Sequence, residues 1–127
     1  MKTLLIAVAV SALSLPALLP QNAKPKPDAK KQFVYVLHLA PVWLDQTKWT
    51  QQQQDIIAKH VEWLKKQHAD GKLVFAGRTM VDNPMGLVVL EVDTEAEARS
   101  IMEGDEAVKQ KLMTAELSPF QVVLERK

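Results

Sequence analysis

The stretch FVYVLHLA, residues 33–40, predicts the first strand of the domain. It is rich in β-branched, aromatic and leucine residues, a composition that is typical of a strand. Because successive side chains of a strand point to opposite faces, the odd-numbered residues from Phe33 to Leu39 share one face and the even-numbered residues from Val34 to Ala40 share the other. Both faces are largely apolar, so we expect this strand to be covered on both sides.

A long helix is expected next. Thr50 and Gln53 have the spacing of a capping box, and the helix is predicted to continue to about Ala69 and to stop at Gly71. Its predicted inward stripe is formed by residues that recur at helical spacing: Ile57, Val61, Leu64 and His68, with His60 beside them. Trp63 and Ile56 lie on a flank of that stripe, where they can contact another element or a partner chain.

The rest of the chain predicts two further strands, a short helix and a last strand. The strands are expected at residues 72–77 and 86–92, with a turn at residues 82–84 between them. Thr94 and Glu97 form a second capping box, which opens a helix that ends at Gly104, and Asp105 can cap one or two further turns. A last strand is expected at residues 114–124, where Pro119 favours an edge position or a bulge.

The predicted order of elements is β-α-β-β-α-β, which defines an α+β, ferredoxin-like domain with an antiparallel sheet and both helices on one face. The other face of the sheet is still apolar, and a monomer would leave that area exposed. An exposed apolar face of this kind usually marks an interface. We therefore expect a homodimer in which two sheets pack face to face.

The N-terminus predicts export. Residues 1–23 have a positive start and an apolar run from Leu4 to Leu19, which is short for a membrane-spanning helix and contains Pro16 near its end. We interpret this segment as a signal peptide with an undetermined cleavage site; the alternative is an uncleaved anchor. The lysines that follow disfavour stable membrane insertion, residues 24–32 form a Pro/Lys-rich linker, and residues 33–125 form the folded domain. The expected location is periplasmic or secreted.

Composition excludes several classes of function. The chain has no cysteine, which excludes thiol nucleophiles, cysteine-ligated metal centres and disulfides. Its 16 basic and 15 acidic residues give a net charge of +1, but the basic excess lies before Phe33, so the predicted domain is slightly acidic. Binding to nucleic acid is therefore not expected.

The sequence resembles the YCII-related family of small dimeric α+β barrel proteins. The likeness covers residues 33–124 and rests on the order of its motifs: His60-Val61-Glu62-Trp63-Leu64, the segment from Gly71 to Gly77, Asp82 before Gly86, Asp105-Glu106 after the second helix, and Pro119-Phe120. This chain has Arg78 where the family usually has proline, and no proline follows Asp105. The resemblance implies a dimeric α/β-barrel fold and a His–Asp pair in a cleft.

His60 is the best candidate for chemistry, because the ordinary pKa of imidazole, ~6.5, suits proton transfer in both directions near neutrality. The alternative is a buried, hydrogen-bonded core histidine. Two carboxylates are candidates for its partner, Asp82 in a predicted loop and Asp105 at a predicted helix start, and Asp82 is slightly favoured. Each also has a purely structural explanation, as a turn residue or as an N-cap.

Arg78 and His38 are the candidate substrate-binding residues. The guanidinium of Arg78 can hold a carboxylate through two hydrogen bonds; the alternative is a solvated residue at a strand end. His38 lies on the strand face opposite Tyr35 and can line a dimer interior, unless it is simply packed there. No metal-binding motif or phosphate-binding loop is present, so neither a metal nor another cofactor is expected.

Two functions remain open. The first is a cofactor-independent enzyme in which His60 transfers protons on a small organic molecule, by isomerisation or elimination, with Asp82 or Asp105 fixing its tautomer. The resemblance is compatible with it, since one YCII-related protein acts as a dehydrochlorinase. The second is a non-catalytic module of the cell envelope that binds a small ligand or a protein in an apolar cleft.

Overall fold

The computed structural model describes residues 30–127. The predicted signal peptide and most of the predicted linker lie outside this range. The elements follow the order β1 (Lys31–Leu39), η1 (Pro41–Trp43), η2 (Gln46–Lys48), α1 (Gln51–Ala69), β2 (Leu73–Arg78), β3 (Met85–Val92), α2 (Glu95–Gly104), α3 (Glu106–Lys109) and β4 (Met113–Phe120). None of the helices in this part of the chain has the length and apolarity that a bilayer span requires.

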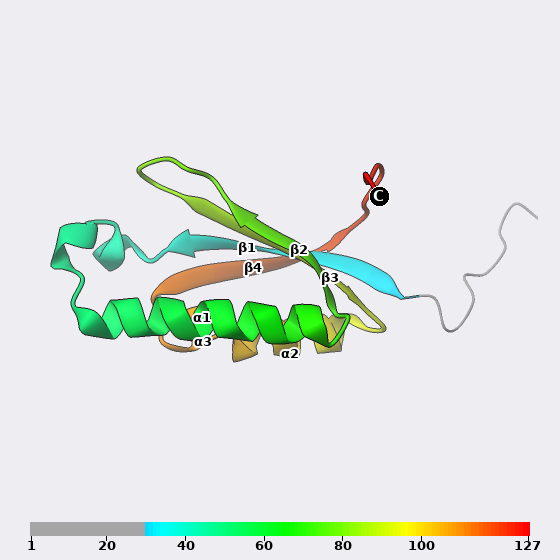
Figure 1. The fold of residues 1–127 in the computed structure, drawn as a ribbon, viewed down its shortest axis with the longest axis horizontal. Helices are drawn as coiled ribbons and strands as arrows, with labels where there is room; N and C mark the ends of the chain where they lie inside the picture. Colours follow the sequence, from blue (N-terminus) through cyan, green and yellow to red (C-terminus); the bar gives the residue numbers. More distant parts are fainter. Residues whose placement is uncertain (1–29) are drawn as a thin grey trace, which may run out of the picture.

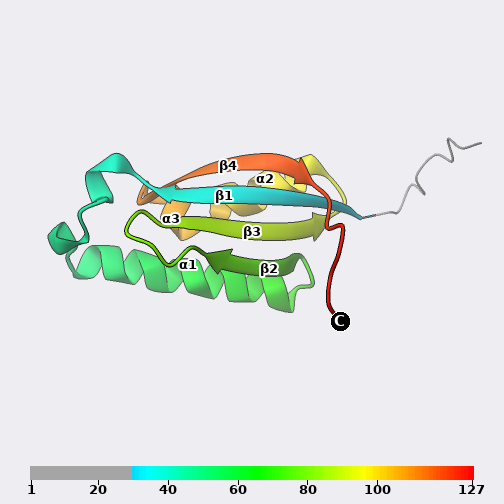
Figure 2. The same ribbon diagram turned by 90° about the horizontal axis from the view of Figure 1, so that it is seen from above.

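The four strands form one antiparallel sheet in the order β2-β3-β1-β4, which is the ferredoxin-like topology. Figure 1 shows all three α-helices beneath one face of the sheet, and Figure 2 shows the strands from above. The predicted fold class is confirmed. Because β4 is an edge strand, the predicted edge position of Pro119 is also confirmed.

The core lies between the sheet and the helices. Tyr35 and Leu37 of β1 and Leu90 of β3 pack there against Ile101 and Met102 of α2. Alternation along β1 therefore places the odd-numbered residues toward the helices, as expected. Val34 and Val89 point to the outer face of the sheet and are also buried. On that face, however, Val36 and Leu87 are half-buried and His38 is exposed, so the outer face is covered only in part.

Helix α1 begins and ends as predicted. Thr50 and Gln53 form the capping box, and Gly71 follows the helix with a φ of 74°, a conformation that glycine adopts without steric cost. At the start of α2 the predicted box is only half made, because the Thr94 side chain accepts from the backbone N–H of Glu97, whereas the Glu97 carboxylate pairs with Lys72 at 3.1 Å.

The buried face of α1 differs from the predicted stripe. Ile56 is buried with Ala107 and Leu112, whereas Val61 and His68 are exposed. The reason is that α1 packs beside α2 and α3 as well as over the sheet: the indole Nε1 of Trp63 donates to the carbonyl of Ile101 in α2 at 3.0 Å. The side of α1 that faces α2 and α3 is therefore covered, and the two residues predicted to lie on its flank, Ile56 and Trp63, are packed there.

The last strand is shorter than predicted. It ends at Phe120 rather than Leu124, and the backbone N–H of Val122 donates to the side chain of Gln32 at 2.8 Å instead of extending the ladder. The first strand begins two residues earlier than expected, at Lys31.

Candidate active site

His60 of α1 contacts Asp105, which stands at the joint between α2 and α3. The Nδ1 atom of His60 lies 2.7 Å from Oδ1 and 2.9 Å from Oδ2 of this carboxylate. The Asp105 side chain is fully buried, and the His60 side chain is 12% exposed. The two residues are 45 positions apart in sequence and meet because α1 packs against α3.

The end of α2 positions Asp105 beside His60. The helix stops at Gly104, against which the Trp63 ring packs so closely that a Cβ at this position would lie 2.7 Å from the ring atom Cζ2. Asp105 then adopts an extended backbone and caps α3, accepting from the backbone N–H of Ala107 at 3.1 Å. Its structural role as an N-cap and its contact with His60 are thus made by the same carboxylate.

Tyr35 supplies a further hydrogen bond to Asp105. From the central strand β1 its hydroxyl donates to Oδ2 at 3.0 Å, and the ring is completely buried. Burial, followed by the nearby negative charge of Asp105 and the hydrogen bond to it, raises the pKa of Tyr35 well above its ordinary value. The hydroxyl therefore keeps its proton and remains a donor.

These contacts fix the direction of the hydrogen bond between His60 and Asp105. A carboxylate that accepts from a tyrosine hydroxyl and a backbone N–H in a buried position is best satisfied as an anion, which has acceptor sites only. Nδ1 of His60 is then the donor, and the neutral ring carries its proton there. Nε2 is left with a lone pair and has no hydrogen-bond partner among residues 30–127.

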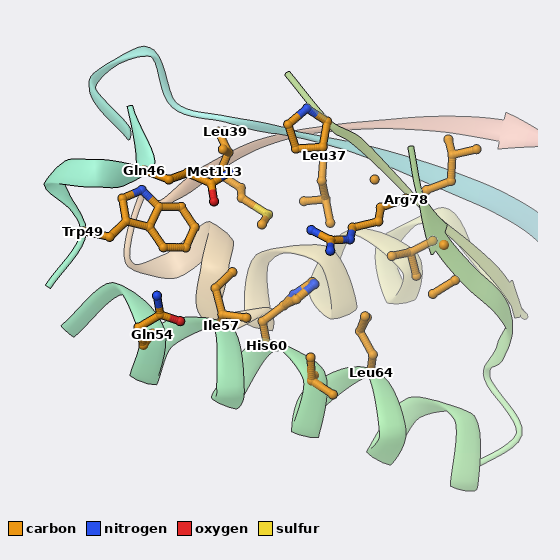
Figure 3. Close-up of a pocket in the computed structure, with 17 residues that line it drawn as sticks. Leu37, Leu39, Gln46, Trp49, Gln54, Ile57, His60, Leu64, Arg78 and Met113 are labelled. Carbon is orange, nitrogen blue, oxygen red and sulfur yellow. The ribbon is translucent and has the colours of Figure 1, made fainter. Parts of the chain in front are cut away.

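His60 lines a cavity of about 550 Å³ between α1 and the sheet. Figure 3 shows the imidazole rising from α1 into this space. Most of the wall is apolar, and it includes the stripe that the sequence singled out on α1: Ile57, Val61 and Leu64. Ile57 and Leu64 therefore pack against the core and also line the cavity, whereas Val61 lines the cavity alone.

Arg78 faces His60 from the other side of the cavity. It is the last residue of β2, and Figure 3 shows its guanidinium extending toward the imidazole. No ion pair or hydrogen bond involves its side chain within residues 30–127. Trp49 and Gln54 lie at one end of the same cavity and add an indole ring and an amide to its lining.

The structure separates the remaining predicted residues from this site. The slight preference for Asp82 as the partner of His60 is corrected: Asp105 makes the contact, and Asp82 is exposed in the loop between β2 and β3 and does not line the cavity. The reason is that Asp82 lies in the exposed loop that connects β2 to β3, whereas Asp105 is buried between the helices and β1. His38 lies on the outer face of β1, as expected, and does not reach the cavity either.

Sequence reasoning missed Tyr35 and Trp49. The sequence pattern places Tyr35 on a strand face among apolar residues, and a tyrosine buried on a core face needs a partner for its hydroxyl. That requirement is the signal that could have drawn attention to it. For Trp49 no comparable signal exists, because its place depends on how the segment of η1 and η2 folds back.

Imidazole, carboxylate and phenol groups in this arrangement can transfer protons. Among the residues described, no three histidine, aspartate or glutamate side chains gather in a group that could hold a metal ion. The arrangement has one imidazole nitrogen directed at a cavity and one cation opposite it, which suits a general base or acid beside a developing negative charge.

Comparison with known proteins gives a family and a fold. The YCII-related domain family matches residues 30–121. Among solved structures, the chain is similar to 5-chloro-2-hydroxyhydroquinone dehydrochlorinase (TftG) from Burkholderia phenoliruptrix AC1100, in complex with 2,5-dihydroxybenzoquinone. The TM-score is 0.55 at 20% identity, over 71% of this chain and 93% of the other. No curated protein sequence matches.

Proposed function

The chain belongs to the YCII-related domain family, and on that premise we propose that it is a cofactor-independent enzyme that transfers protons on a small organic molecule. The observation that carries this proposal is the 2.7 Å contact between His60 and the buried Asp105 at the wall of a cavity. The dehydrochlorinase activity of the similar structure supports elimination as the reaction type.

In the proposed reaction on a chlorinated hydroquinone, the ring first takes its keto form, in which a ring hydroxyl has given up its proton to become a carbonyl and the chlorine-bearing carbon has gained a proton. Nε2 of His60 then takes the proton of a second ring hydroxyl. The electrons of the broken O–H bond form a second carbonyl, the ring double bond shifts toward the chlorine-bearing carbon, and chloride departs with its own bonding pair, which leaves a quinone. Asp105 keeps the imidazole in the correct tautomer and stabilises the imidazolium that forms. An isomerisation differs in that the proton is returned to a ring carbon and no group leaves.

Arg78 is proposed to bind an anionic oxygen of the substrate. Its guanidinium lines the cavity opposite His60, and the surrounding walls are mostly apolar. A guanidinium next to the reacting atoms can hold a carboxylate or phenolate and stabilise charge that builds up on oxygen. The proposed substrate is therefore a compact molecule with an apolar ring and at least one acidic oxygen.

The test is chloride release from a panel of chlorinated hydroquinones that includes 5-chloro-2-hydroxyhydroquinone. His60→Gln keeps a polar side chain of similar length and removes the base, so we expect a loss of about 100-fold or more in kcat/KM. His68→Gln is the matched control, because His68 lies exposed on the same helix and does not line the cavity. Full activity in a folded His60→Gln variant would contradict the proposal.

The alternative is a non-catalytic module that binds a small ligand, and the apolar cavity with its tryptophan favours it as second candidate. Under this alternative Trp49→Ala weakens binding of 2,5-dihydroxybenzoquinone more than His60→Gln does. Trp63 is unsuitable for this comparison, because its indole packs against α2 and does not line the cavity.

A homodimer is part of the proposal. Alternation along the strands places Phe75 and Phe120 on the outer face of the sheet, where they are 47% and 40% exposed. Large apolar side chains on a sheet face favour burial against a second sheet.

Export is the last part of the proposal. Its support is the apolar segment that begins the sequence and the lysines that follow it. The mass of the protein recovered from the periplasm or the medium after expression of the full chain tests it: removal of roughly twenty residues is expected for a cleaved signal peptide, and an intact chain held in the membrane fraction would contradict it.

A further inference from the structure

We propose that Tyr35 is a positioning residue that acts through Asp105 to set how tightly His60 holds a proton on Nε2. The inference rests on the proposed function, from which the use of His60 as the proton carrier is taken. It goes beyond that function because it assigns a role to a side chain that does not line the cavity.

The first step concerns the carboxylate of Asp105. It is fully buried, and every oxygen has a donor other than His60: the N–H of Ala107 at Oδ1 and the hydroxyl of Tyr35 at Oδ2. Hydrogen bonds to an ion are stronger than those between neutral groups and stabilise its charge in place of water. Tyr35 thus takes up part of the charge of Asp105 that would otherwise act on His60 and the N–H of Ala107.

The second step concerns the surroundings of His60. The titratable and charged groups that face it come from separate elements: Asp105 from the joint between α2 and α3, Tyr35 from β1 behind Asp105, and Arg78 from β2 across the cavity. Asp105 favours the imidazolium and Arg78 disfavours it. The hydrogen bond from Tyr35 weakens the influence of Asp105 without adding a net charge.

The proton affinity of His60 should therefore change when the hydroxyl of Tyr35 is removed. Tyr35→Phe removes the hydroxyl and leaves the ring that fills the core, so the carboxylate should bind the imidazolium more strongly. His60 should then take up its proton at a higher pH. In Tyr35→Phe, His60 would accept a proton more readily but would release it less readily at the end of the reaction. The Tyr35 hydroxyl of the wild type avoids this slower release.

The experiment follows the ring C–H resonances of the histidines by NMR through a pH titration, in the wild type, Tyr35→Phe, Asp105→Asn and the double variant. In Tyr35→Phe we expect the titration midpoint of His60 to rise by about half to one pH unit. In the Asp105→Asn background the same change should have no effect, because the residue through which Tyr35 acts is neutral. His38 and His68, both exposed, serve as internal controls in every spectrum.

A second measurement covers the case in which Tyr35→Phe does not fold. Tyr35 is the single tyrosine of the chain, so 3-fluorotyrosine can be incorporated at this position alone. The more acidic phenol is a stronger donor, and we expect the midpoint of His60 to fall.

An unchanged midpoint in folded Tyr35→Phe, or an equal rise with and without Asp105, would overturn the inference. The titration needs no substrate, so its outcome is independent of the chloride-release test. Retained activity in His60→Gln refutes the proposed function, whereas the double-variant comparison decides the role of Tyr35.

Discussion

Asp105 shows how one side chain can satisfy a structural and a chemical requirement together. It caps α3 through Ala107 and accepts from Tyr35 and His60, so its negative charge is compensated although it is removed from water. A buried carboxylate without such partners would cost several kcal/mol. The fold therefore needs the donors, and the proposed chemistry uses one of them.

Tyr35 makes the stability of the protein depend on pH in the alkaline range. Its pKa is raised in the folded state by burial, so an unfolded chain loses this proton above about pH 10 while the folded chain keeps it. The free energy of unfolding of the wild type should then fall by about 1.4 kcal/mol per pH unit relative to Tyr35→Phe. Urea unfolding at several pH values checks this difference; parallel curves for the two proteins would show that Tyr35 ionises normally.

Arg78 should determine affinity for anions. We expect Arg78→Gln to weaken binding of 2,5-dihydroxybenzoquinone by about tenfold or more, since a hydrogen bond between charged groups is lost. Quenching of tryptophan fluorescence measures it, because Trp49 lines the same cavity. Arg99→Gln is the control, as Arg99 lies exposed on α2 and pairs with Glu95. An equal effect of both substitutions would remove Arg78 from the site.

At the residue scale the sequence singled out His60 and Arg78, and both line the cavity. The sequence does not distinguish Asp82 from Asp105 as the partner of His60, because each aspartate also stands where a turn or a helix cap is expected. Only the packing of α1 against α3 distinguishes them. Tyr35 was missed for a related reason, since its partner lies 70 positions away.

At the scale of elements, helix α1 shows that the hydrophobic pattern of a helix does not by itself identify its buried face. Its apolar stripe was expected to face the core, yet Val61 borders an open cavity and is 41% exposed, whereas Ile56 is buried. Periodicity identifies a helix and its apolar side. It does not tell whether that side is covered by protein or is left for a ligand, which depends on the neighbouring elements.

The close contact between Gly104 and Trp63 can be tested by substitution. Gly104→Ala removes chain entropy from the unfolded state, which alone would stabilise by about 0.4–1 kcal/mol. The added Cβ would lie 2.7 Å from the indole, however, and overpacking costs about 1–3 kcal/mol. We expect net destabilisation in thermal unfolding. Gly77→Ala is the matched control, with no atom within 4 Å of its Cβ; equal effects of both would exclude the contact as the cause.

At the scale of the whole molecule, the order of strands and helices follows from the sequence, and strand ends are right within a few residues. Strand alternation, capping residues and the glycine after α1 are local signals, and they were sufficient for the topology. The 3-10 turns before α1 have local signals of their own, Pro41 at the start of η1 and the Asp45 cap of η2, but these do not fix how the segment folds back.

The outer face of the sheet predicts self-association. We expect sedimentation equilibrium to give twice the mass of the chain, and Phe75→Glu to shift the protein toward the monomer because a charge would be buried in the interface. Met80→Glu is the control, since Met80 is 80% exposed and lies in the loop after β2. A monomeric wild type would contradict the proposed face-to-face dimer.

The proposed proton transfer depends on the tautomer of His60, because a base that faces the cavity requires a lone pair on Nε2. Long-range proton–nitrogen correlation spectra of the neutral ring identify the protonated nitrogen. We predict a proton on Nδ1, donated to Asp105, and a bare Nε2. A proton on Nε2 would mean that Asp105 does not accept from this ring, and the proposed proton transfer by His60 would then have no basis.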